Sequence, residues 1–156
     1  MKIGFVYGRK PSSTLTRIFT GSTCYHVFFV DEPAGKMYDM HLIRRRRAWP
    51  HYPADRQIIL VDCPVDVPAE YLERMLDTDE TAYGWRDYLL FVLRPIYHLF
   101  GRSTRNAAGV ICSEMVANDL IANGWRVRFP EVPSPADLEI AILGRKDAIH
   151  GRKRRL

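Results

Sequence analysis

Runs of apolar residues in the first half of the chain predict β-strands. Two segments, Lys2–Tyr7 and Cys24–Asp31, are rich in the β-branched and aromatic residues that favour strands. Turn-forming residues at 32–35 follow the second segment, so residues 36–43 are predicted to return beside it as a hairpin. The compact apolar segment 58–62 predicts another strand.

Helical spacing of apolar residues is the main pattern in the second half. A helix is predicted to begin at residue 68, where a proline precedes alanine and glutamate. Another is predicted over residues 113–123, with Gly124 as its stop. Ser134 then predicts an N-cap, and Pro135 falls in the first turn of a last short helix.

Two further helices are predicted, over residues 14–19 and over residues 85–100. The second carries a proline, Pro95, at which a helix is expected to kink or split, because the ring clashes with the preceding turn. Strands therefore come first along the chain and helices afterwards. This order indicates the α+β class.

The composition is that of one ordinary globular domain. Of the 156 residues, 47% are hydrophobic and 26% are charged. This composition is enough for a buried core and excludes a chain that is disordered throughout. The 23 Lys and Arg exceed the 18 Asp and Glu, and the basic residues of 145–156 account for this excess. We therefore predict a domain over residues 1–144 and a flexible basic tail over residues 145–156, with weak affinity for an anionic partner.

Cysteine usage and the N-terminal sequence bear on the compartment. Three cysteines, an odd number, do not make a disulfide framework. The first apolar run stops at Gly8, without the longer apolar core and cleavage site of a secretory signal. Residues 85–100 fall short of the ~20 apolar residues that span a bilayer. A cytoplasmic protein with no transmembrane segment is expected.

Metal chemistry is not indicated by the spacing of possible ligands. The five histidines and three cysteines form neither a Cys-x-x-Cys nor a His-Glu-x-x-His motif. We therefore expect no metal site and no cofactor.

Cys112 is the leading candidate for a nucleophile, because it lies where a loop or strand end meets the helix predicted over residues 113–123. The dipole and the unpaired N–H groups at a helix N-terminus favour a thiolate. The same N–H groups can hold a developing oxyanion. The alternative is a small buried residue at the base of a helix.

His26 lies inside the apolar strand Cys24–Asp31, where an imidazole needs a hydrogen-bond partner or a cleft. Strand alternation predicts that His26 shares a face with Cys24, while Tyr25 and Val27 face the other way. Same-face residues two apart lie about 6.5–7 Å from each other, too far for proton transfer between Cys24 and His26. The partner of His26 must therefore come from elsewhere in the chain.

Asp39 is the candidate third residue. A hairpin closing at residues 32–35 would bring it beside the strand of His26, where its carboxylate could orient the imidazole. His41, two residues further on, would share that face and is the second choice for this position. Its alternative interpretation is a solvated or structural histidine.

Three segments together resemble a known family: Ser22-Thr23-Cys24-Tyr25-His26-Val27, Val110-Ile111-Cys112-Ser113-Glu114 and Pro133-Ser134-Pro135-Ala136-Asp137-Leu138. The chain resembles the circularly permuted branch of the NlpC/P60-type papain-like cysteine hydrolases, the YiiX/YebB-like and lecithin:retinol acyltransferase-like group, which includes small phage-encoded members. The resemblance covers about residues 3–143. In this branch the histidine strand precedes the cysteine, as it does here.

The resemblance implies a permuted papain-like fold and a catalytic triad. It makes Cys112 the nucleophile, His26 the general base and Asp39 the residue that orients the base. It also suggests Tyr25 and Ser113 as substrate-binding residues, with the Tyr25 hydroxyl near the oxyanion or its ring narrowing the cleft. The implied reaction is thiolate acyl transfer on an amide or ester, with a cell-wall-type peptide as the first choice and a lipid ester or thioester as the alternative.

A binding protein without enzymatic activity is the other class of function. Four consecutive arginines, residues 44–47, precede aromatic residues and could contact a phosphate backbone or an anionic lipid. A solvated strand end, balanced by the acidic residues between 62 and 80, is the preferred interpretation of this run. On this alternative the chain would be a virion-associated or nucleic-acid-associated module that uses the tail, residues 145–156.

Overall fold

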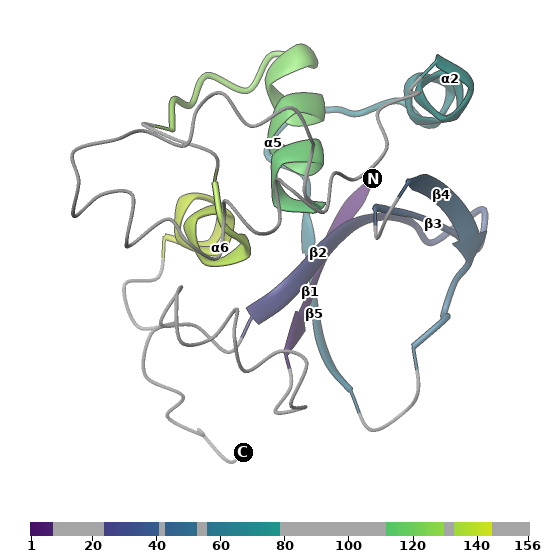
Figure 1. Ribbon diagram of the computed structural model, residues 1–156, viewed down its shortest axis with the longest axis horizontal. Helices are drawn as coiled ribbons and strands as arrows, with labels where there is room; N and C mark the ends of the chain where they lie inside the picture. Colours follow the sequence, from purple (N-terminus) through teal and green to yellow (C-terminus); the bar gives the residue numbers. More distant parts are fainter. Residues whose placement is uncertain (8–23, 41–42, 53–55, 79–111, 130–132, 145–156) are drawn as a thin grey trace.

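The computed structural model describes residues 1–7, 24–40, 43–52, 56–78, 112–129 and 133–144. Within these ranges the chain forms one antiparallel sheet and three helices (Figure 1). The strands, in sheet order β4-β3-β2-β1-β5, are β4 (Arg44–Ala48), β3 (Lys36–Met40), β2 (Cys24–Asp31), β1 (Lys2–Tyr7) and β5 (Gln57–Asp62). The helices are α2 (Ala69–Thr78), α5 (Cys112–Ala122) and α6 (Pro135–Leu143). The predicted α+β class is confirmed.

The hairpin between β2 and β3 forms where the turn residues predicted it. Gly35 has a φ of 62° and donates its N–H to the carbonyl of Glu32, a backbone conformation that glycine adopts without strain. β3 ends at Met40, earlier than the predicted residue 43, and a further strand begins at Arg44. That strand, β4, lies at the edge of the sheet, where charged side chains are common.

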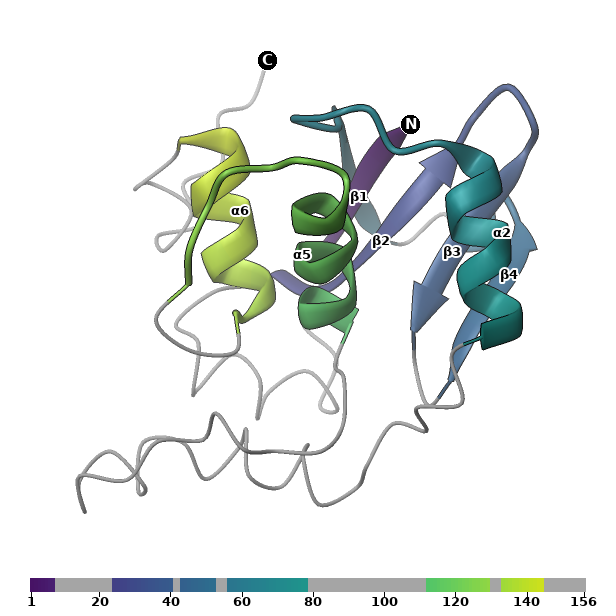
Figure 2. The same cartoon turned by 90° about the horizontal axis from the view of Figure 1, so that it is seen from above.

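The three helices lie on one face of the sheet (Figures 1 and 2). α5 and α6 pack side by side over β2, while α2 lies over the β3–β4 end. The core beneath them contains the following buried residues of the sheet and the helices: Ile3, Phe5, Val27, Phe29, Tyr38, Met40, Leu72, Met115, Val116, Leu120 and Leu138. Burial of this apolar surface is the main force that holds the helices to the sheet.

The opposite face of the sheet carries a second cluster, which we call the histidine face. It consists of Val6, Phe28, Val30 and Met37, with Tyr25, Trp49, Tyr52, Ile58 and Leu60 packed against them. The ring of His26 stacks on that of Phe28 on this face, with centroids 6.0 Å apart. The placement of His26 with Phe28 and of Val27 on the other side confirms the predicted alternation beyond residue 26.

Before residue 26 the predicted alternation is wrong. Val6 pairs with His26, but its neighbour Tyr7 pairs with Cys24, so β2 contains one extra residue at this point. Such a β-bulge reverses the facing of the residues that precede it. Cys24 consequently joins the core under the helices, and Tyr25 lies on the histidine face.

Local signals explain where the helices begin and end. Ser134 caps α6: its hydroxyl accepts from the N–H of Asp137, whose carboxylate accepts from the N–H of Ser134. Gly144 ends that helix in the left-handed conformation, and Gly124 follows α5 with a φ of 100°. The predicted helix at residue 113 begins one residue earlier, at Cys112 itself.

Several predictions fall on residues outside the described ranges. These are the helices at 14–19 and 85–100, the side chain of His41 and the basic tail at 145–156. In the described ranges, no helix is long and apolar enough to cross a membrane. No group of three or more possible metal ligands gathers there either.

Candidate active site

Asp39 and His26 face each other on the histidine face of the sheet. The Oδ2 atom of Asp39 lies 3.9 Å from the Nε2 atom of His26, and both side chains are almost completely buried. They come from adjacent strands of the predicted hairpin, so β2–β3 pairing determines their separation. The separation is longer than a hydrogen bond, so the contact between the imidazole and the carboxylate is electrostatic.

The ring of His26 is held by aromatic neighbours. Phe28 stacks on it from the same strand, and Tyr52 approaches it at a tilt, with ring centroids 6.4 Å apart. The Nε2 atom of the ring faces the carboxylate of Asp39.

Cys112 occupies the first position of α5, and its thiol is surrounded by backbone N–H groups. Those of Val27, Ser113 and Cys112 itself hydrogen-bond to the sulfur and lower the pKa of the thiol. Val27 lies in β2 beyond the residues that pair with β3, which run from Asp31 to Phe29. The start of α5 therefore reaches the edge of β2 directly beside His26.

Burial outweighs these hydrogen bonds. Cys112 is only 9% exposed, and loss of solvent, with a smaller contribution from the charge of Asp39, raises the pKa of its thiol to about 11. The predicted stabilisation of the thiolate by backbone N–H groups is present, but burial has the larger effect on the pKa of the thiol. At neutral pH the sulfur carries its proton, so a nucleophilic role requires a base.

The structure thus brings the elements of all three predicted catalytic residues to one region. Val27 touches Cys112 and follows His26 in the chain, while Asp39 lies close enough to both side chains to interact with their charges.

Tyr25 and Ser113, the two predicted substrate-binding residues, have partners within the protein. The Tyr25 hydroxyl accepts a hydrogen bond from Arg56, whose guanidinium also lies 5.6 Å from the centre of the tyrosine ring. Ser113 is completely buried and donates its hydroxyl proton to the carbonyl of Pro133, 2.7 Å away. Ser113 therefore contributes to the site through its backbone N–H, and substrate contact by its side chain stays a prediction.

Two residues near the site were not predicted. Arg47 places its Nε atom 3.5 Å from Oδ1 of Asp39, and its guanidinium also contacts His51 at 2.7 Å. Tyr52 packs against His26 and Phe28 from the chain that follows β4. The one sequence signal for Arg47 and Tyr52 was that the run of arginines lies close to aromatic residues in the chain.

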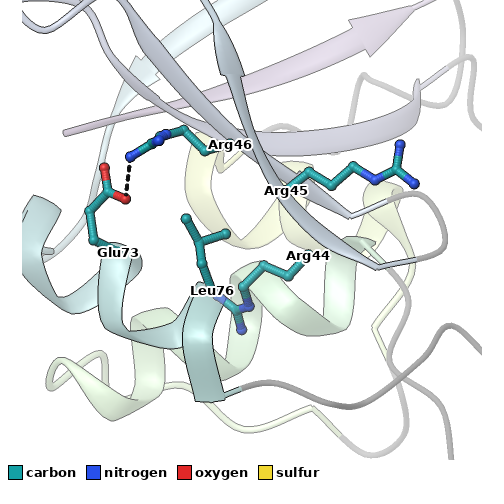
Figure 3. A pocket seen from close by; sticks show the side chains of 5 residues that line it. All are labelled: Arg44, Arg45, Arg46, Glu73 and Leu76. Carbon is teal, nitrogen blue, oxygen red and sulfur yellow. Dashed lines mark hydrogen bonds and ion pairs between the residues drawn. The ribbon is translucent and has the colours of Figure 1, made fainter.

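The arginines of β4 alternate between the two sides of the sheet. Arg44 forms two hydrogen bonds, of 2.6 and 3.2 Å, with the buried carboxylate of Asp119 in α5. Arg46 contacts Glu73 of α2 at 2.8 Å, across an open cleft that Arg45 and Leu76 also line (Figure 3). With Arg47 beside Asp39, three of the four arginines have carboxylate partners. The run is therefore mostly neutralised. Of its three partners only Glu73 lies between residues 62 and 80, and Arg44 is buried, so the predicted solvated strand end balanced by those acids is confirmed only in part.

The other two cysteines differ from Cys112 in their surroundings. Cys24 is buried in the core under the helices, and burial raises the pKa of its thiol well above the ordinary value. Cys63 is partly exposed beyond β5, and burial raises the pKa of its thiol to about 12. All three thiols are free, and three backbone N–H groups, those of Val27, Ser113 and Cys112 itself, lower the pKa of the Cys112 thiol.

Comparison with known proteins adds no family to this description. No protein-family model, no curated protein and no solved structure matches the chain. The class defined by the fold and the site is thus an α+β protein with a buried histidine–carboxylate pair beside a helix-terminal cysteine.

Proposed function

We propose that the chain is a cysteine hydrolase that works by acyl transfer, with Cys112 as nucleophile, His26 as general base and Asp39 as the residue that orients His26. The proposal rests mainly on one arrangement. A buried carboxylate lies 3.9 Å from a buried imidazole, and the thiol at the start of α5 contacts the backbone of the residue next to that imidazole. Nucleophile, base and orienting group in this relation are typical of covalent acyl transfer.

In the first step the Cys112 sulfur attacks the carbonyl carbon of the substrate and its proton passes to His26. The carbonyl π electrons move to oxygen, and the tetrahedral intermediate then collapses. The bond to the leaving amine or alcohol breaks, and the leaving group takes the proton from His26. Because the thiol has a pKa of about 11, this proton transfer must accompany the attack.

In the second step water attacks the thioester carbon while His26 accepts a proton from it. Collapse of this second intermediate breaks the carbon–sulfur bond, and the Cys112 sulfur recovers its proton from His26. The carboxylate of Asp39 stabilises the imidazolium that forms in both steps. The backbone N–H of Cys112 is one donor to the oxyanion, since it already points at the reacting sulfur.

The proposed substrate is an amide or ester, with a peptide of the cell-wall type as the first choice and a lipid ester or thioester as the second. The resemblance to the permuted branch of papain-like cysteine hydrolases supports this choice, as does the order of histidine strand before cysteine helix. The finer fold, a circularly permuted papain-like domain over residues 1–144, belongs to the same proposal.

Hydrolysis of p-nitrophenyl acetate tests the proposal. The wild-type protein should release p-nitrophenolate, while Cys112→Ala should fall to the rate of buffer alone and His26→Ala should lose about 100-fold or more. Cys63→Ala is the matched control, because Cys63 is a free thiol outside the site, and it should retain the full rate. Equal rates for Cys112→Ala and wild type would rule out Cys112 as the nucleophile.

A further inference from the structure

Tyr52 carries a buried hydroxyl at the candidate site. Its ring packs against Phe28, with centroids 5.3 Å apart, and against the rings of His26 and His51. The hydroxyl oxygen is buried, yet it has no hydrogen-bond partner in the described part of the chain. A buried hydroxyl without a partner destabilises a protein, so its position calls for an explanation.

The other four tyrosines of the described ranges differ from Tyr52 in that their hydroxyls have hydrogen-bond partners. The hydroxyls of Tyr7, Tyr38 and Tyr71 donate to carboxylates of Glu139, Glu73 and Asp119, and that of Tyr25 accepts from Arg56. Each of these four hydroxyls binds a charged side chain. Among the five tyrosines of the described ranges, Tyr52 is the one whose hydroxyl makes no hydrogen bond there.

The position of the Tyr52 hydroxyl suits a substrate contact. The ring of Tyr52 approaches that of His26, with centroids 6.4 Å apart, and Asp39 and Cys112 both raise the pKa of the hydroxyl. Burial, followed by the charge of Asp39, raises its pKa well above 10, so the hydroxyl keeps its proton throughout the neutral range. The protonated Tyr52 hydroxyl can therefore donate a hydrogen bond to a substrate. The carboxylate of Asp39, in contrast, faces the imidazole of His26.

We propose that the Tyr52 hydroxyl donates a hydrogen bond to the carbonyl oxygen of the substrate while the Cys112 sulfur attacks the carbonyl carbon. It would be the second donor to the oxyanion, beside the backbone N–H of Cys112. This inference rests on the proposed function and deepens it. It also replaces the predicted oxyanion role of the Tyr25 hydroxyl, which Arg56 already engages.

Tyr52→Phe tests the proposal, since it removes the hydroxyl and keeps the ring that packs on Phe28 and His26. With p-nitrophenyl acetate as the probe, kcat/KM should fall about 100-fold, the effect of losing one oxyanion donor. Alkylation of Cys112 by iodoacetamide forms no oxyanion, so its rate should stay within about twofold of wild type. Tyr71→Phe, which removes a hydroxyl bound to Asp119 away from the site, should retain the wild-type kcat/KM.

Three results would overturn the inference in distinguishable ways. If Tyr52→Phe hydrolyses the ester as fast as wild type, the hydroxyl does not contact the reacting carbonyl, although the proposed function stands. If alkylation slows as much as hydrolysis, the hydroxyl acts on the thiol and not on the substrate. If wild type and Cys112→Ala hydrolyse the ester equally, the proposed function itself fails.

Thermal unfolding supplies an independent measurement. Because the hydroxyl has no partner in the described part of the protein, its removal should leave Tm unchanged or raise it. A fall of several degrees in Tm would reveal an internal partner and would overturn the proposal. Tyr71→Phe should lower Tm, because it deletes a hydrogen bond to the buried Asp119.

Discussion

Arg47 and His26 lie near different oxygen atoms of the Asp39 carboxylate. The Nε atom of Arg47 lies 3.5 Å from Oδ1, whereas the Nε2 atom of His26 lies 3.9 Å from Oδ2, so one buried carboxylate faces both an arginine and a histidine. The contact arises because β4 pairs with β3, which places Arg47 diagonally across from Asp39 on the histidine face.

Arg47→Gln should therefore weaken the site through Asp39. We expect kcat for p-nitrophenyl acetate to fall about tenfold with little change in KM, because the substrate contacts remain. The free energy of unfolding should fall by about 1–3 kcal/mol, since a buried charge loses a partner. Arg45→Gln is the control, because Arg45 is an exposed arginine of the same strand. Equal effects of the two substitutions on kcat would show that Arg47 does not act through Asp39.

Gly4 allows the ring of Phe28 to lie flat against β1. The two residues are directly paired, and a Cβ atom on Gly4 would lie 2.5 Å from the end of that ring. Gly4→Ala must push the ring away, so it should reduce the free energy of unfolding by about 1–3 kcal/mol in urea titrations. Adding Phe28→Leu should make the alanine less costly, because the shorter side chain leaves room. Additive losses in the double variant would contradict this account.

The buried pair Arg44–Asp119 joins the edge strand β4 to α5. Both side chains are under 10% exposed, and the Tyr71 hydroxyl also donates to Asp119, at 3.2 Å. Arg44→Met should cost about 3–5 kcal/mol, since it leaves a carboxylate buried without its cation. Combining it with Asp119→Leu should recover most of the loss, because no charge then stays buried. Chemical denaturation of the two single variants and the double variant measures this coupling.

Local patterns in the sequence predicted the parts of the fold that short-range physics determines. The Ser134 cap, the turn before Gly35 and the apolar strand around His26 each depend on neighbouring residues, and each is confirmed. The closeness of Asp39 and His26 could be predicted from the hairpin, because a short turn determines the pairing of the few residues on either side of it.

Other features depend on partners distant in sequence and could not be predicted. The bulge at Tyr25 arises from pairing with β1, and the arginine strand β4 is stabilised by carboxylates of α2 and α5. The roles of Arg47 and Tyr52 require the register of β4 and the path of the chain after it. The raised pKa of Cys112 comes from burial, which no local pattern reports.

Glu73 should make the protein sensitive to acid. A hydrogen bond from Lys36, with others from Arg46 and Tyr38, lowers the pKa of its carboxyl from 4.5 to about 2. The stabilisation is therefore complete above about pH 4.5, and it is lost as the pH falls from 4.5 towards 2. Glu73→Gln should lower Tm at pH 7 and flatten its decline below pH 4.5. An unchanged slope of Tm against pH would contradict the assignment.

The pH dependence of Cys112 alkylation should separate the two roles of Asp39. The carboxylate is among the causes that raise the pKa of the thiol to about 11, after burial. In wild type, labelling by iodoacetamide should therefore rise about tenfold per pH unit between pH 7 and 10, following the thiolate fraction. Asp39→Asn removes a negative charge, so the midpoint should move to lower pH and labelling at pH 8 should accelerate.

The same substitution should slow hydrolysis of p-nitrophenyl acetate, because His26 loses the carboxylate that orients it and stabilises its protonated form. Faster alkylation of Cys112 together with slower hydrolysis of the ester is expected only if Asp39 acts on both Cys112 and His26. Asp62→Asn, at the end of β5 on the opposite edge of the sheet, should change neither rate. If Asp39→Asn slowed labelling and hydrolysis alike, loss of local structure would be the simpler explanation, and a Tm measured on the same sample would decide between the two.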